Sequence, residues 1–388
     1  MDKRSYIFSA AFLGMLIFGI VMAVLGAILP SVIVRFGLDE ADAGSLFLLM
    51  NFGMLLGSLV FGPIVDRYGY KGLLLVCTTL VFLGFIGISQ LPTVEWLRVS
   101  IFFVGFGGGM INGGTNALVS DLSTESRSSG LSYLGVFFGI GAFGIPFVLG
   151  TLLDIFEYME IIGGVGALLL LPLIFFALIR FPEPKQKQGF PLKQALGLTK
   201  EGKLLLFGLI LFLQSGLEMT VGGWAAEYLH QEMGFASGRA VIMLSLFWLG
   251  LCLARLAGGK ILMYVSPALV LQVSLGISII GSVILLTAQH PYLAVTGLVL
   301  LGIGFAIVFP AVLGFVGDAY PQLSGTAFSV VLVMALTGGM LLPWITGLLA
   351  SAFDLRSALV IIPGAVVGVF IIFRIVHSLM QKEKNEAE

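Results

Sequence analysis

The sequence places an acidic side chain, Glu218, well inside an apolar segment that is long enough to cross a membrane. A carboxylate at such depth costs about 2.5–3.5 kcal/mol on insertion scales, so it indicates a functional site. Away from water a carboxyl group favours its neutral form, and returning water favours release of the proton. We therefore predict that Glu218 is a proton-coupling residue and the one buried acid of its segment. The alternative is a neutral glutamate that only hydrogen-bonds a neighbouring helix.

Amide side chains accompany this acid. Gln214 lies one turn before Glu218 on the same helical face. Asn112, Thr115 and Asn116 follow i, i+3, i+4 spacing and form one polar face on another apolar segment. Because amides both donate and accept hydrogen bonds, these residues suit a neutral, hydroxyl-rich solute. Hydrogen bonding between helices is the alternative for all four polar residues.

Two tryptophans and one further asparagine complete the predicted substrate site. Trp224 and Trp248 can stack on the apolar face of a sugar ring, although tryptophan near a helix end is also typical of the membrane interface. Trp224 follows the pair Gly222-Gly223, which can interrupt the helix and turn the ring inward. Asn51 is another polar group at membrane depth.

The elements that carry these residues are predicted to be transmembrane helices. The chain is 58% hydrophobic and 11% charged, with a mean hydropathy of +1.08, whereas a soluble domain carries about a quarter charged residues. Segments that are apolar on all sides and roughly 20 or more residues long fit helices that cross about 30 Å of hydrocarbon, and not the alternating strands of a membrane barrel. We predict an all-α membrane protein with twelve transmembrane helices, at residues 6–36, 43–65, 72–90, 94–120, 130–153, 161–181, 203–228, 239–262, 268–289, 292–316, 325–350 and 356–377.

The charge distribution predicts the orientation. With a cytoplasmic N-terminus, an even number of helices returns the C-terminus to the cytoplasm. Sixteen of the twenty Lys and Arg residues then lie at or near the cytoplasmic side, as the positive-inside rule requires. The other four are Arg35, Arg98, Arg239 and Arg356. We predict a multi-pass protein of a prokaryotic inner membrane with both termini cytoplasmic.

The two halves of the sequence match each other at a gap-free offset of 197 residues, which indicates a duplication. The matched pairs include Gly53 with Gly250, Gly105 with Gly302, Asp121 with Asp318, and Pro146 with Pro343. We predict two pseudo-symmetric six-helix halves, residues 1–181 and 203–388, joined by a cytoplasmic linker at 182–202. The basic, proline-containing linker is interpreted as a solvated loop, with binding to anionic lipid headgroups as the alternative. Parallel repeats of this kind typically hold a substrate between them near the midplane.

One loop carries a family resemblance. The stretch Gly62-Pro-Ile-Val-Asp66-Arg67-Tyr-Gly69-Tyr-Lys71 is similar to the cytoplasmic signature G-x-L-x-D-R-x-G-x-[RK] of the major facilitator superfamily. The resemblance implies a cytoplasmic gate, and the alternative is a loop that only caps and orients helices. In the second half Met263 stands where Asp66 would map, so the signature has decayed there. The residues that we assign to the gate are Asp66, Arg67, Lys71, Asp121 and Arg127.

Two segments resemble the fucose–galactose–glucose permease branch of that superfamily. They are the glycine- and asparagine-rich stretch 105–119 and the stretch that begins at Gly216-x-Glu218. The resemblance implies uptake of a neutral sugar coupled to a cation, usually a proton. The acidic residues that fucose permeases carry in helices one and four fall on Gly26 and Asn112 here. Glu218 matches the glutamate of the glucose-type members, which favours glucose-like hexoses over fucose.

Three functions remain open. The first is a secondary active transporter that moves a neutral hexose by proton-coupled symport through alternating access, with sodium as the other coupling ion. The second is a proton-driven exporter of drugs or amphipathic metabolites, which the 32 phenylalanines favour. The third is a non-transporting sensor or scaffold. We find no phosphate-binding loop, metal-spaced cluster or nucleophile–base pair, so we expect no enzyme activity, cofactor, metal or nucleic-acid partner, and a monomer in the lipid bilayer.

Overall fold

The computed structural model describes residues 3–90, 93–122, 127–183, 201–320 and 323–387. These residues form helices because a backbone surrounded by hydrocarbon must satisfy its own N–H and C=O groups. The first half contains α1 (Lys3–Phe36), α2 (Glu40–Gln90), α3 (Val94–Leu122), α4 (Arg127–Leu152), α5 (Tyr158–Leu168) and α6 (Leu170–Leu178). The second half contains α8 (Gly202–Gln231), α9 (Ser237–Ile261), α10 (Pro267–Thr287), α11 (Pro291–Phe305), α12 (Val308–Ala319), α13 (Ser324–Ala352), α14 (Leu355–Ala358) and α15 (Ile361–Ala387).

The prediction of twelve membrane crossings is confirmed. Eleven helical stretches of the described chain are long and apolar enough to cross a membrane. One of them, α2, holds two crossings, because its 51 residues include a non-helical turn at Gly69 with φ 69° and ψ 175°. Glycine is suited to this position because it adopts positive φ without a Cβ clash. The crossings predicted at 161–181 and 292–316 are each built from two consecutive helices, α5 with α6 and α11 with α12.

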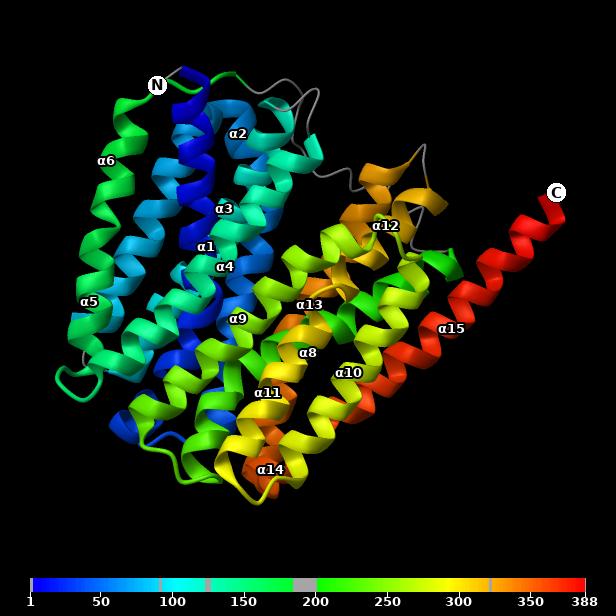
Figure 1. Ribbon diagram of the computed structural model, residues 1–388. Helices are drawn as coiled ribbons and strands as arrows, with labels where there is room; N and C mark the ends of the chain where they lie inside the picture. The colour runs from blue at the N-terminus through cyan, green and yellow to red at the C-terminus, as the bar shows by residue number, and fades with distance from the viewer. Residues whose placement is uncertain (1–2, 91–92, 123–126, 184–200, 321–322, 388) are drawn as a thin grey trace.

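The helices form two groups that lie side by side (Figure 1), with α1–α6 in the blue-to-green group and α8–α15 in the green-to-red group. Close contacts join the groups where glycines allow backbones to meet. A Cβ on Gly26 of α1 would lie 2.0 Å from the carbonyl oxygen of Gly222 in α8. Gly150 of α4 and Gly238 of α9 meet in the same way. Both contacts lie near the helix ends that are on the side of the molecule away from the N- and C-termini.

The two groups repeat the same contacts at the predicted offset of 197 residues. Gly105 packs against the backbone oxygen of Met50, and Gly302 packs against that of Phe247. Gly107 and Gly304 likewise meet the backbones at Cys77 and Ser274. Each partner is displaced by 197 residues, so the second, third and fourth crossings of one half superimpose in register on those of the other. The pseudo-symmetry predicted from sequence is therefore present in the packing.

The linker at 182–202 stays a prediction, because residues 184–200 lie outside the described part of the chain. The side chain of Arg127 is also outside it, although this residue begins α4.

Candidate functional site

Glu218 lies inside α8 with 9% of its surface exposed and has an arginine as its neighbour. The guanidinium Nη2 of Arg255 in α9 is 3.8 Å from Glu218 Oε2. Two unit charges at this separation attract by about 4 kcal/mol at an effective dielectric constant of about 20. The Arg255 side chain is 30% exposed, so solvent screening lowers the net stabilisation by the ion pair. The buried acid thus belongs to an ion pair that links α8 to α9.

The same arginine holds an interrupted helix. Helical hydrogen bonding breaks at Ala306 and Ile307, between α11 and α12. Pro310 follows Ala306 by four residues and has no N–H to donate to its carbonyl. Arg255 Nε donates to this Ala306 oxygen over 3.1 Å. A carbonyl that the helix cannot satisfy is therefore bonded by the cation that pairs with Glu218.

Gln214 reaches the same break from α8. Its Nε2 donates to the Phe305 carbonyl oxygen over 3.3 Å, and the side chain is fully buried. Among the described residues, no donor bonds to Gln214 Oε1. A buried acceptor without a partner is unusual, and it offers a hydrogen bond to a hydroxyl group. The predicted pair of Gln214 and Glu218 is thus brought together with Arg255 around one backbone interruption.

Asn51 lies where the two halves meet. A Cβ on Gly339 of α13 would be 3.7 Å from Asn51 Oδ1 and 3.8 Å from the Ser215 carbonyl oxygen of α8. Asn51 is 2% exposed and donates through Nδ2 to the Phe47 carbonyl oxygen over 2.9 Å. This side chain from the first half therefore lies beside the stretch of α8 that carries the acid.

The polar face of α3 divides into two environments. Asn116 Nδ2 donates to the Asn112 backbone oxygen over 2.8 Å and to Asn112 Oδ1 over 3.0 Å, and both side chains are partly exposed. Thr115 is fully buried against α1, and its hydroxyl donates to the Ile111 carbonyl oxygen over 2.8 Å. Within the described residues no hydrogen bond joins these three side chains to the group around Glu218.

Both tryptophans are buried, Trp224 in α8 beyond Glu218 and Trp248 in α9. Trp224 has no exposed surface, donates through Nε1 to the Pro343 carbonyl oxygen over 3.0 Å, and packs on Phe47 of the first half. Trp248 is 1% exposed and packs against Gly222 and the Phe138 ring. In this conformation both rings fill the interface between the halves, and neither presents an open face for stacking.

The residues of the predicted gate fasten helix ends within the first half. The Tyr70 hydroxyl donates to Asp121 Oδ2 over 2.6 Å, which joins the α2 turn to α3. Lys71 Nζ donates to the Ala177 carbonyl oxygen over 2.5 Å, which joins the turn to α6. Arg67 stacks over the Tyr68 ring, and Asp66 is exposed.

Two residues of the second half were missed by sequence reasoning. The charge distribution assigns Arg255 to the cytoplasmic cations, although this residue falls inside the crossing predicted at 239–262, where a cation indicates a functional site. Glu227 corrects the prediction of one buried acid, because it is 2% exposed and Gln231 Nε2 donates to its Oε1 over 2.5 Å. Glu227 follows Glu218 by nine positions, which places the two acids on opposite sides of α8, about 13 Å apart along its axis.

Two parallel helical repeats, with an interrupted helix and ionisable side chains beside the interface between them, define the architecture of a secondary transporter. A family model agrees with this class. The model of the Major Facilitator Superfamily matches residues 11–331 and 206–388. The chain belongs to the major facilitator superfamily.

Individual relatives are distant. An uncharacterized transporter of Sinorhizobium fredii is 26% identical over 363 residues, 90% of this chain and 92% of that protein. The glucose/mannose transporter GlcP of Bacillus subtilis is 24% identical over 364 residues, 89% of this chain and 88% of that protein. The solved structure of a mutant of the nucleoside transporter NupG matches with a TM-score of 0.81 and 18% identity, covering 97% of this chain and 100% of that one. The solved structure of a D-xylose-proton symporter matches with a TM-score of 0.80 and 15% identity, covering 96% of this chain and 97% of that one.

Proposed function

We propose that the protein is a proton-coupled symporter that takes up a neutral hexose-type sugar by alternating access. The observation that carries the proposal is the group formed by Glu218, Arg255 and the interrupted helix, which links a group able to exchange a proton to a break in a helix. The similarity to a glucose/mannose transporter supports the choice of solute. The proposal includes both termini on the cytoplasmic side.

The polar groups favour a neutral solute. The Glu218 and Arg255 charges offset each other, and the remaining groups are amides with spare hydrogen-bonding capacity. Gln214 Oε1 can accept from a sugar hydroxyl, and the partly exposed Asn112 and Asn116 can donate and accept. Asn51, Trp224 and Trp248 stay in the proposed site as residues of the surrounding shell, which an opening of the interface would expose. Thr115 stays in it as a residue of the same helix as Asn112 and Asn116.

Proton exchange at Glu218 gives a physical route to coupling. The charged acid attracts Arg255, which also donates to Ala306. Protonation removes that attraction and leaves Arg255 bonded to the backbone alone. The balance between the two states therefore acts on the α11–α12 break. The proposed gate at Asp66, Arg67, Lys71, Asp121 and Arg127 holds or releases the helix ends as the halves move.

Transport in proteoliposomes tests the proposal. Counterflow of labelled glucose, mannose, galactose and xylose identifies the solute without an ion gradient. Inward pH and sodium gradients, applied separately, then identify the coupling ion. Glu218→Gln should keep counterflow and lose acceleration by pH. Glu201→Gln is the matched control, because this acid is exposed at the start of α8 and its side chain caps nothing. Sugar uptake that ignores the pH gradient, or a pH gradient that drives export of apolar compounds instead, would refute the proposal.

A further inference from the structure

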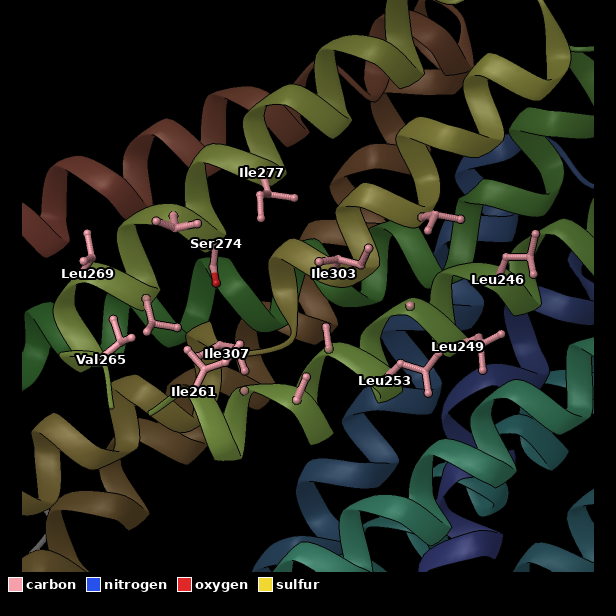
Figure 2. A pocket seen from close by; sticks show the side chains of 17 residues that line it. Leu246, Leu249, Leu253, Ile261, Val265, Leu269, Ser274, Ile277, Ile303 and Ile307 are labelled. Atoms are coloured by element: carbon pink, nitrogen blue, oxygen red, sulfur yellow. The ribbon is translucent and has the colours of Figure 1, made fainter. Parts of the chain in front are cut away.

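A cavity of about 680 Å³ lies within the second half and is lined by α9, α10 and the α11–α12 crossing. Figure 2 shows its side chains, all of them aliphatic except Ser274. A cavity with a single hydroxyl cannot satisfy a polar solute, so it does not belong to the sugar site proposed above.

The cavity faces away from the first half. Leu253 and Ala257 line it from one side of α9. Trp248 lies nine residues before Ala257, on the opposite side of the helix, and its ring is 6.3 Å from the Phe138 ring of the first half. Leu253 is 56% exposed, and Val273 on the facing helix α10 is 53% exposed. In a membrane this opening therefore meets lipid.

The shape and charge of the opening fit one kind of occupant. Along α9 the cavity runs from Leu246 to Ile261, a length of about 22 Å, and so follows a helix that is long and apolar enough to cross the bilayer, the direction in which acyl chains also run. Ile261 ends α9, and the exposed Lys260 precedes it. A lysine at this position can bury its stem and present its ammonium group to a headgroup. We propose that the cavity binds one acyl chain of an anionic glycerophospholipid, whose headgroup is held by Lys260.

The bound chain would support the interrupted helix from the lipid side. Ile303, before the break, and Ile307, within it, both line the cavity (Figure 2). Arg255 approaches the same break from the opposite side of α9 and bonds to Ala306. The lipid and the ion pair therefore act on the two sides of one interruption in the helix. This inference does not depend on which solute the protein transports.

Lipid retention by the purified full-length protein tests the inference. Delipidated protein is mixed with phosphatidylglycerol or with neutral phosphatidylcholine, and retained lipid is counted by native mass spectrometry. The variants Ala257→Phe and Val273→Phe fill the cavity from two different helices. Leu256→Phe is the matched control, since Leu256 is 44% exposed and does not line the cavity. Lys260→Gln removes the charge beside Ile261, where the cavity ends along α9.

We expect the wild-type protein and Leu256→Phe to retain one phosphatidylglycerol. Either filling variant should reduce retention at least about tenfold, a difference of about 1.4 kcal/mol. Lys260→Gln should remove the preference for phosphatidylglycerol over phosphatidylcholine. Unchanged thermal unfolding shows that a variant is folded. Equal retention by wild type and both folded filling variants would overturn the inference, as would an equal loss in Leu256→Phe. A preference for phosphatidylglycerol that survives in Lys260→Gln would overturn the assignment of the headgroup to Lys260. Displacement of the lipid by transported sugar would overturn the assignment of a lipid as the occupant.

Discussion

Under a pH gradient, the logarithm of the accumulation ratio of the solute should be proportional to the number of protons that the site exchanges. Glu218 lies with Gln214 and Arg255 at the helix break, whereas Glu227 lies on the other side of α8 with Gln231 as its partner. We therefore expect one proton per solute, carried by Glu218.

The expected accumulation of solute follows from the number of coupled protons. One pH unit across the membrane corresponds to about 1.36 kcal/mol per proton. One coupled proton then supports about tenfold accumulation of a neutral solute per pH unit, and two support about a hundredfold. Glu218→Gln preserves the shape of the side chain but exchanges no proton, so the accumulation ratio should fall to about one. Arg255 is 30% exposed and keeps its bond to Ala306, so the variant does not leave an isolated buried charge.

The measurement uses proteoliposomes whose membrane potential is held at zero with valinomycin and equal potassium on both sides. Internal solute is measured at equilibrium for several pH gradients, and the logarithm of the accumulation ratio is plotted against the gradient. The expected slope is one for the wild-type protein and zero for Glu218→Gln, with counterflow retained in both. The control Glu201→Gln should keep the wild-type slope.

Two results would refute this reasoning. A slope of one in Glu218→Gln would show that another group carries the proton. A wild-type slope of two that falls to one in Glu227→Gln would show that both acids of α8 exchange protons, and that their separation on the helix does not separate their functions.

Three further predictions concern the parts that hold the site. Arg255→Gln should abolish pH-driven accumulation in the same assay. It should also lower the free energy of unfolding by about 1–3 kcal/mol, because the Ala306 carbonyl at the helix break loses its charged donor. Unchanged accumulation would contradict the role of Arg255 in coupling. Gly105→Ala should destabilise by about 1–3 kcal/mol, because the new Cβ would lie 1.9 Å from a backbone oxygen of α2, whereas Gly144→Ala meets nothing within 4 Å and should not. The unfolding temperatures of Gly105→Ala and Gly144→Ala are compared, and equal temperatures would contradict the packing argument. Tyr70→Phe should lower stability by about 0.5–1.5 kcal/mol through loss of the hydrogen bond to the α3 carboxylate, and an unfolding temperature equal to that of wild type would show that the bond contributes nothing.

The sequence predicts the fold well because the signals for it are local or repeated. Long apolar segments indicate each crossing, and the 197-residue offset indicates the pairing of the halves. Contacts such as Gly105 with Met50, repeated as Gly302 with Phe247, agree with that offset. The turn between the second and third crossings depends on a single glycine conformation at Gly69, which hydropathy does not register.

The candidate site was predictable only in part, because its partners come from different helices. Glu218 and Gln214 are visible as polar residues on one helical face. Pro310 is also visible and accounts for a freed carbonyl four residues earlier, so the helix break could have been predicted. Nothing local shows that Arg255, on another helix, donates to that carbonyl and faces the acid. That contact requires the packing of three helices, which one sequence does not supply.

The duplication explains where this contact came from. Ser58 Oγ donates to the Gly109 backbone oxygen over 3.4 Å in the first half, and adding 197 to both numbers gives the Arg255 bond to Ala306 over 3.1 Å. The fold therefore supplies the same approach of second and fourth crossings twice. In the first half the neutral hydroxyl of Ser58 lies at this approach, and in the second half the guanidinium of Arg255 does. Since the acid that faces the cation is also confined to the second half, the charged and titratable part of the site depends on side chains that diverged within a shared backbone arrangement.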